Sequence, residues 1–210
     1  MNIIEQTINA TKLGGVIMYP LIILFIMAIT LIIDKILIYK KLVKLPKDLL
    51  ELIETYGFSW NELEEKLKNL PSQNYYRRFF SVISQNKSRP IWWLESRAGD
   101  EVKLIEKSLA GGLWILETIV TVAPLLGLLG TIAGMMDSFK LIGDDTLINP
   151  TGVTAGVAQA LIATAFGLGI AIFSLFAFNY FSRRQDQLLD ELESLGTRMT
   201  DHIRLDREEK

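Results

Sequence analysis

Apolar residues are concentrated in three long stretches of the chain, and charged residues fill most of the sequence between them. Stretches 16–33 and 152–181 contain no charged residue, and stretch 113–136 contains a single ionisable residue, Glu117. A helix needs about 20 residues to cross a hydrocarbon core of ~30 Å. All three stretches are long enough, so the pattern predicts an all-α integral membrane protein with transmembrane helices at 16–33, 113–136 and 152–181.

Two other interpretations of these stretches are weaker. Each could be a buried helix of a soluble protein, but the length of the uncharged runs argues against that. The first stretch could be a cleaved signal peptide. Glu5 precedes it, no basic cluster leads it, and no small-residue cleavage pattern follows, so we interpret it as a retained anchor.

The basic residues predict the orientation of the spans. Most lysines and arginines lie in 34–112 and in the tail 182–210, and several directly follow the first and third spans: Lys35, Lys40, Lys41, Lys44, Arg183 and Arg184. By the positive-inside rule, these two segments are cytoplasmic. The N-terminal segment 1–15 and the loop 137–151 then face the outside, which agrees with the acidic residues of that loop, Asp137, Asp144 and Asp145.

The cytoplasmic segments show helical periodicity. In 34–112, leucine and isoleucine recur at three- and four-residue intervals among charged residues, and Ser59 with Glu62 predicts a capping box at one helix start. Apolar residues continue at this spacing from Ile91 to Leu109 into the second span, which predicts one long helix. The tail 182–210 continues the third span as a helix. Segment 34–112 is therefore predicted to be a helical cytoplasmic domain.

Composition excludes several classes of function. The chain is 50% hydrophobic, has no cysteine, and its only histidine, His202, lies in the charged tail. The lack of cysteine excludes thiolate metal sites and a cysteine nucleophile, and a single histidine argues against a histidine-centred metal site or catalytic triad. A net charge of −2 gives no general attraction to nucleic acid. No phosphate-binding G-x-x-x-x-G-K-[ST] motif occurs, so we do not expect nucleotide hydrolysis as an energy source. Taken with the composition, this predicts no cofactor, no metal and no enzymatic activity.

One helix face of the second span carries polar residues and proline. Its members follow at intervals of four and three residues: Glu117, Thr121, Pro124, Leu128, Thr131 and Met135. Beside them lie Gly127, Gly130 and Gly134, which permit close contact with another helix. Pro124 removes the hydrogen bond to the carbonyl four residues earlier, so that carbonyl needs another partner or water.

The third span carries a stripe of small residues. Gly156, Ala160, Ala163, Gly167 and Ala171 share one face, and Gln159 and Thr164 flank it. Such a stripe is a packing surface in a membrane. It predicts pairing of the second and third spans, subunit assembly, or both.

The threonines have two interpretations. A membrane threonine often bonds only to a carbonyl of its own helix. Here the threonines occur on two adjacent glycine-rich spans, near Pro124 and Gln159, which favours a hydrated path. For Glu117, near the cytoplasmic end of the second span, the alternative is an interfacial carboxylate that extends into water.

Two segments resemble the ExbB/TolQ/MotA proton-channel family. Residues 122–139, VAPLLGLLGTIAGMMDSF, are similar to its second-span signature, and residues 156–172, GVAQALIATAFGLGIAI, are similar to its third-span signature. Ala177-Phe178-Asn179 resembles the motif that follows. The number of spans, their orientation and the large cytoplasmic insert also agree, and the likeness is closest to the ExbB/TolQ type.

The resemblance implies a homo-oligomeric ring, a pentamer, in the inner membrane. The ring would surround a dimer of a small single-span ExbD/TolR-like protein whose intramembrane aspartate carries protons. A TonB- or TolA-like protein would then deliver the work of proton flow across the periplasm to the outer membrane. By motif match, Pro124, Thr131 and Thr164 are pore-lining positions.

The sequence departs from the family pattern at two positions. Gln159 stands where the family has glutamate, and Phe173 stands where it has proline. A glutamine side chain forms hydrogen bonds but does not titrate near neutral pH, so Gln159 can only orient water or a partner's carboxylate. Glu117 is then the only carboxylate inside a span.

Other functions remain open from the sequence. A self-contained ion channel or transporter would use Glu117 and Gln159 as its filter, and a scaffold would use only the cytoplasmic helices. A flagellar-type stator subunit is a third alternative, although three spans and 210 residues resemble an ExbB or TolQ protein more than the stator subunit, which is usually longer and has four spans. The sequence does not separate an ExbB role from a TolQ role, and the transported substrate would be chosen by partners.

Overall fold

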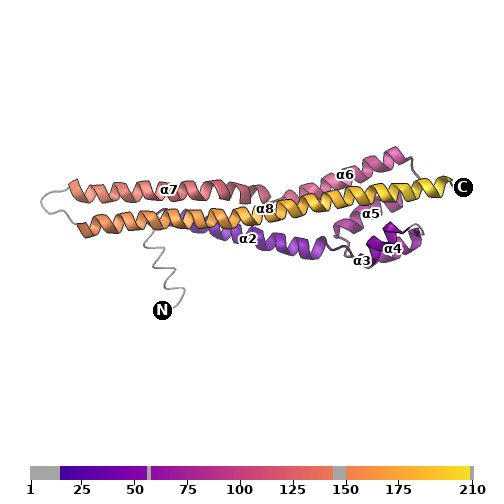
Figure 1. The fold of residues 1–210 in the computed structure, drawn as a ribbon, viewed down its shortest axis with the longest axis horizontal. Helices are drawn as coiled ribbons and strands as arrows, with labels where there is room; N and C mark the ends of the chain where they lie inside the picture. The colour runs from indigo at the N-terminus through magenta and orange to yellow at the C-terminus, as the bar shows by residue number, and fades with distance from the viewer. Residues whose placement is uncertain (1–14, 56–57, 144–149, 209–210) are drawn as a thin grey trace. The chain divides into compact units, whose positions relative to one another are not determined.

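The computed structural model describes residues 15–55, 58–143 and 150–208, and every regular element in these ranges is an α-helix (Figure 1). The chain divides into two units. The first combines Met1–Ile32 with Gly112–Tyr180, and the second combines Ile33–Gly111 with Phe181–Lys210. The predicted segment 1–15, apart from Gly15, and residues 144–149 of the predicted loop lie outside the described residues, as do 209–210.

The described chain contains three helical stretches that are long and apolar enough to cross a membrane. These are Met18–Leu42, Ile91–Phe139 and Gly152–Glu208, with mean hydropathies of 2.8, 2.0 and 2.3 in their most apolar windows. The predicted all-helical architecture with three candidate membrane helices is therefore confirmed.

The first unit contains three helices or parts of helices. They come from α2 (Met18–Leu42), α7 (Leu113–Gly143) and α8 (Pro150–Glu208), and α7 lies beside the first part of α8 (Figure 1). Phe25 of α2 packs against α8, with ring centroids 6.0 Å from Phe166 and 6.4 Å from Phe173. Phe173, the position where the family resemblance expects proline, thus contributes to the contact between α2 and α8.

Large apolar side chains cover the outside of this unit. Ile23, Ile26, Leu125, Leu129, Phe139, Leu161 and Phe176 are all exposed. Contiguous apolar surface of this kind is rare on a soluble monomer and marks contact with lipid or with another protein. The surface therefore fits a protein that spans a membrane.

The predicted single helix from Ile91 through the second span is wrong, because it breaks at two glycines. Helix α6 (Ile91–Ala110) ends before Gly111, and α7 begins after Gly112. Gly112 has φ of +82°, a conformation that side chains with Cβ rarely adopt. In the second unit, the buried ammonium of Lys35 donates a hydrogen bond of 2.5 Å to the Leu109 carbonyl in the last turn of α6. A cation at this end satisfies a carbonyl that the helix leaves open.

The second unit is a helical domain with its own core. It contains α3 (Lys47–Glu54), α4 (Trp60–Lys68), α5 (Tyr75–Gln85), α6 and the C-terminal part of α8. Apolar side chains at helical spacing from all five meet in one cluster: Leu49, Ile53, Leu63, Phe79, Phe80, Ile83, Leu94, Ile105, Leu109, Leu192 and Met199. The periodicity of the sequence therefore reflects real burial.

One helix start differs from its prediction and another was missed. Ser59 occupies the N-cap position of α4, but its side chain makes no cap hydrogen bond, so the predicted capping box is wrong. Asn74 caps α5 instead, accepting from the amides of Tyr76 and Arg77 at 3.0 and 3.2 Å. Its side-chain amide also donates to the Lys44 carbonyl, which ties α5 to the chain before α3.

A buried tyrosine ties α5 to α8. The Tyr76 hydroxyl donates a hydrogen bond of 2.8 Å to the Glu191 carboxylate, and Tyr76 is buried. Burial raises the pKa of Tyr76, and the bond to Glu191 raises it further. Tyr76 is therefore neutral and remains a donor at physiological pH.

The core of the second unit can be tested with two aromatic truncations. Phe80 is 0% exposed, whereas Trp92 is 70% exposed. Phe80→Ala should destabilise this domain by about 3–5 kcal/mol because it removes a buried ring and leaves a cavity. Trp92→Ala should change its stability by less than about 0.5 kcal/mol. Circular dichroism during thermal unfolding of the detergent-solubilised chain measures both, and equal shifts would contradict the assignment of the core.

Candidate functional site

Helices α7 and α8 approach each other at glycine and alanine. A Cβ atom added to Gly127 would lie 2.9 Å from the Thr164 Cα atom. Added to Gly130 or Gly134, it would lie 2.7 or 2.8 Å from an alanine Cβ atom of α8, and real Cβ atoms essentially never come within 3.0 Å. Any other residue at these positions would push the two helices apart.

The α8 side of this contact has the same character. A Cβ atom at Gly167 would lie 2.5 Å from the Ala123 carbonyl oxygen, and one at Gly156 would overlap the Ser138 hydroxyl. Ala160 and Ala163 are buried. The structure thus places seven of the predicted packing residues at the contact between α7 and α8 of one chain: Gly127, Gly130, Gly134, Gly156, Ala160, Ala163 and Gly167.

Thr164 uses this close approach to bond across the helices. Its hydroxyl donates a hydrogen bond of 2.8 Å to the Gly127 carbonyl, and its side chain is half-buried. In an α-helix, the same carbonyl also faces the amide of Thr131, four residues later. Thr164 therefore lies within one turn of Thr131, and its oxygen keeps its lone pairs available to accept a further hydrogen bond.

The two threonines of the α7 stripe bond to their own helix. The Thr131 hydroxyl donates to the Leu128 carbonyl at 2.6 Å, and the Thr121 hydroxyl donates to the Thr118 carbonyl at 2.9 Å. Both bonds join a hydroxyl to the carbonyl three residues earlier, which is the type of bond within one helix that the sequence offered as one interpretation of these threonines. Thr131 is half-buried and Thr121 is exposed. Like Thr164, each hydroxyl uses its one O–H donor for a carbonyl, so its oxygen can only accept further hydrogen bonds.

Pro124 lies inside α7, which continues through it without a break. Proline has no amide hydrogen, so the Val120 carbonyl lacks its usual helical partner. Pro124 is half-buried and one turn from Gly127, so it belongs to the same level of the helix pair as Thr164. This part of the helix pair therefore contains the Val120 carbonyl, the acceptor hydroxyls of Thr131 and Thr164, and closely packed backbones.

Gln159 and Glu117 do not join this level. The Gln159 side chain lies against Gly15, where an added Cβ atom would overlap its amide nitrogen, and Gly15 has φ of +71°. It therefore contacts the residue that precedes α2. Glu117 is exposed and lies about 20 Å of helix rise from Thr131. Of the six predicted path residues, Pro124, Thr131 and Thr164 therefore lie within about one turn of Gly127. Thr121 lies about 9 Å of helix rise from Gly127, and Gln159 and Glu117 are set apart from this group.

Two buried hydroxyls were not among the predicted residues. Ser138 donates to the Gly134 carbonyl at 2.8 Å and fills the space beside Gly156. Ser174 of α8 is 0% exposed, and its hydroxyl makes no hydrogen bond to a described residue. A serine in an apolar run gives the same sequence signal whether it faces lipid or a neighbouring helix, so only the structure distinguishes these two.

The described residues contain no group of three or more histidine, aspartate and glutamate side chains that could hold a metal ion. His202 lies in the second unit, where its Nε2 atom is 2.8 Å from the Ile53 carbonyl oxygen. Its ring stacks on Phe58 with centroids 4.3 Å apart. The single histidine therefore serves packing in the helical domain.

Comparison with known proteins shows a family match over the segment that contains α7. The model of the MotA/TolQ/ExbB proton channel family matches residues 70–194, which include α7 and the membrane part of α8. The putative biopolymer transport protein ExbB-like 3 of Synechocystis sp. is 33% identical over 190 residues, which cover 85% of this chain and 87% of that protein.

Two shorter matches cover parts of both chains. The biopolymer transport protein ExbB of Aquifex aeolicus is 40% identical over 87 residues, covering 41% of this chain and 59% of that protein. The Tol-Pal system protein TolQ of Pseudomonas aeruginosa is 39% identical over 84 residues, covering 40% of this chain and 36% of that protein. With the family model spanning more than half of its length, this multi-pass membrane protein belongs to the MotA/TolQ/ExbB proton channel family.

Proposed function

We propose that this chain is the ring-forming subunit of a proton-driven inner-membrane complex that energises transport at the outer membrane. In this proposal, the chain forms a homo-oligomer, a pentamer, around a single-span ExbD/TolR-like partner. A TonB- or TolA-like protein carries the work outward. The observation that carries the proposal is the Thr164–Gly127 hydrogen bond, at the glycine contact of α7 and α8 within the segment that matches the proton-channel family.

The threonine hydroxyls can assist proton transfer as hydrogen-bond acceptors, without themselves binding or releasing a proton. Thr131 and Thr164 both donate to carbonyls, so each presents an oxygen that accepts a hydrogen bond from water or from a protonated carboxyl group. The carbonyl freed by Pro124 adds a further acceptor. Acceptors at one level of the membrane orient donors and stabilise the positive charge of a passing proton.

The titrating group is assigned to the partner. Gln159 does not bind and release a proton near neutral pH, and Glu117 lies about 20 Å of helix rise from the threonines. The level of Thr131 and Thr164 therefore needs a carboxylate from another chain. One proton that crosses 100 mV releases about 2.3 kcal/mol, so a few protons per cycle supply a conformational step of several kcal/mol.

The same proposal fixes the orientation of the chain. The N-terminus and the 137–151 loop face the periplasm, and 34–112 and 182–210 face the cytoplasm. Support comes from the basic residues that follow the first and third spans.

Removal of the threonine hydroxyls tests the path. Thr131→Val and Thr164→Val keep the side-chain shape, and each should reduce partner-dependent proton influx at least tenfold. Tenfold corresponds to about 1.4 kcal/mol, the size of one lost hydrogen bond. The influx is measured as acidification of the cytoplasm with a ratiometric fluorescent protein, in cells that express the chain and its partner.

Thr30→Val is the matched control, because Thr30 is exposed on α2 and bonds to the Ile26 carbonyl of its own helix. It should keep full influx. Full influx in both the Thr131 and Thr164 variants would refute the path. Liposomes that contain the purified chain alone should not pass protons, and rapid partner-free flux would instead favour a self-contained channel.

A titratable group at position 159 gives a second test. Gln159→Glu introduces a carboxyl group on α8 about 7.5 Å of helix rise from Thr164. A charge at this distance acts on the path in a medium of low dielectric constant, so the pH profile of proton influx should gain an additional titration step. Gln159→Met is similar in size and does not titrate, and it should keep the shape of the original profile. Identical profiles for both variants would mean that position 159 does not communicate with the path.

A further inference from the structure

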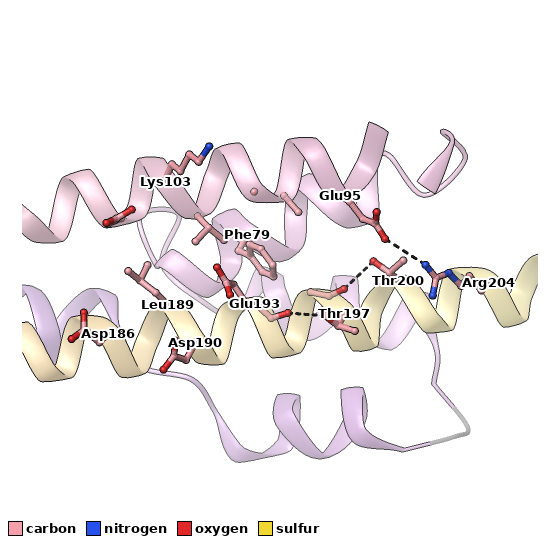
Figure 2. A pocket seen from close by; sticks show the side chains of 15 residues that line it. Phe79, Glu95, Lys103, Asp186, Leu189, Asp190, Glu193, Thr197, Thr200 and Arg204 are labelled. Atoms are coloured by element: carbon pink, nitrogen blue, oxygen red, sulfur yellow. Dashed lines mark hydrogen bonds and ion pairs between the residues drawn. The ribbon is translucent and has the colours of Figure 1, made fainter. Parts of the chain in front are cut away.

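A groove lies between α6 and the C-terminal part of α8 in the second unit (Figure 2). Its volume is about 680 Å³, within the range of about 300–1,000 Å³ that is typical of ligand sites. Apolar side chains of Phe79, Val102 and Leu189 contribute to its lining, and we call it the α6/α8 groove. It has room for a few side chains of a partner.

Two glycines shape the groove. A Cβ atom added to Gly196 of α8 would lie 3.0 Å from the Phe79 ring, so the ring packs directly against the α8 backbone. A Cβ atom added to Gly99 of α6 would meet nothing within 4 Å. The wall at Gly99 therefore faces open space, and a larger side chain there would enter the groove without displacing the protein.

Acidic residues dominate the charged lining. Five carboxylates line the groove, Glu95, Glu106, Asp186, Asp190 and Glu193, against two basic residues, Lys103 and Arg204. Arg204 is already engaged by Glu95 at 3.5 Å and by Asp201 at 3.2 Å. Figure 2 shows Asp186, Asp190 and Glu193 following one another along α8. Like charges at these helical spacings repel each other, so a cationic occupant would relieve the repulsion.

We propose that the α6/α8 groove binds the basic cytoplasmic end of the single-span partner. This inference rests on the proposed function, which supplies the partner. By the positive-inside rule, a single-span membrane protein carries lysine and arginine where its span enters the cytoplasm. Asp186 follows the predicted third span of the same continuous helix after little more than one turn, so the acidic lining begins close to the depth at which such a segment emerges.

The recognition is both apolar and electrostatic. An apolar side chain of the segment rests on Phe79 and Leu189, and neighbouring lysine or arginine side chains pair with Asp190 and Glu193. Desolvated apolar anchors supply most of the affinity of such contacts, whereas complementary charge sets specificity and speeds association. Binding on this pattern weakens with added salt.

The absence of cysteine permits site-specific cross-linking in the assembled complex. Gly99→Cys, labelled with a benzophenone maleimide, should cross-link to a lysine- and arginine-rich flank of a single-span membrane protein, identified by mass spectrometry of the joined peptides. Adding Asp190→Lys and Glu193→Lys should reduce the yield at least fivefold. Glu65→Cys, on an exposed position of α4 outside the groove, is the matched control and should not give this product.

Two results would overturn the inference. One is a cross-link from Gly99→Cys to a second copy of this chain, which would assign the groove to subunit contacts. The other is a yield no higher than that of Glu65→Cys.

A synthetic probe tests the chemistry without the partner. A fluorescein-labelled peptide with lysine and leucine at helical spacing should bind the full chain in nanodiscs, measured by fluorescence anisotropy. The Asp190→Lys and Glu193→Lys pair should raise Kd at least tenfold, and Gly99→Trp should do the same by filling the groove. Glu65→Lys, a charge reversal elsewhere, should leave Kd unchanged. Equal affinity for all four forms would overturn the inference.

The two proposals fail separately. If the threonine variants lose proton influx but the groove gives no specific cross-link, the groove inference fails and the proposed function stands. If the cross-link to the single-span flank forms but the threonine variants conduct normally, the proton path fails and the groove inference stands.

Discussion

The close contact of the α7 and α8 backbones is the constraint on which the membrane unit depends. In lipid there is no hydrophobic force between helices, so they are held by close packing and hydrogen bonds. Glycines at 127, 130 and 134 bring the α8 backbone within reach, and only this proximity lets Thr164 bond to the Gly127 carbonyl. Packing and the candidate path are therefore two consequences of one arrangement, and a bulky residue at Gly127 would disturb both.

The C-terminal end of α6 is determined by glycines and by a lysine side chain. Two glycines interrupt the helix between α6 and α7, and the Lys35 ammonium donates a hydrogen bond to the Leu109 carbonyl in the last turn of α6. Lysine is almost never fully buried unless it is paired. The bond between the buried lysine and this carbonyl therefore stabilises the end of α6. The apolar spacing from Ile91 onward does not continue as one helix because the backbone leaves the helical conformation at Gly111 and Gly112, where Gly112 has a positive φ.

The sequence predicted the features that depend on periodicity and composition. The three apolar stretches, the helical domain and the small-residue faces of α7 and α8 follow from spacing alone, and the structure has helices at each. The sequence could not predict features that depend on which residues, distant along the chain, come into contact. Gln159 against Gly15, Lys35 against Leu109 and the Asn74 side-chain amide against the Lys44 carbonyl all join positions that are far apart in the sequence. The Ser59 box failed because a capping pattern permits a hydrogen bond without requiring it.

The distribution of charge connects the proposed path with the proposed groove. The level of Thr131 and Thr164 offers acceptors but no titratable group, so the chain provides a fixed polar environment there and leaves proton binding to a partner. The α6/α8 groove offers mainly carboxylates to a cationic segment. A partner that spans the membrane once has both features to offer, because its span would carry the carboxyl group that the threonine level lacks and its basic cytoplasmic flank would carry the positive charge that the groove attracts.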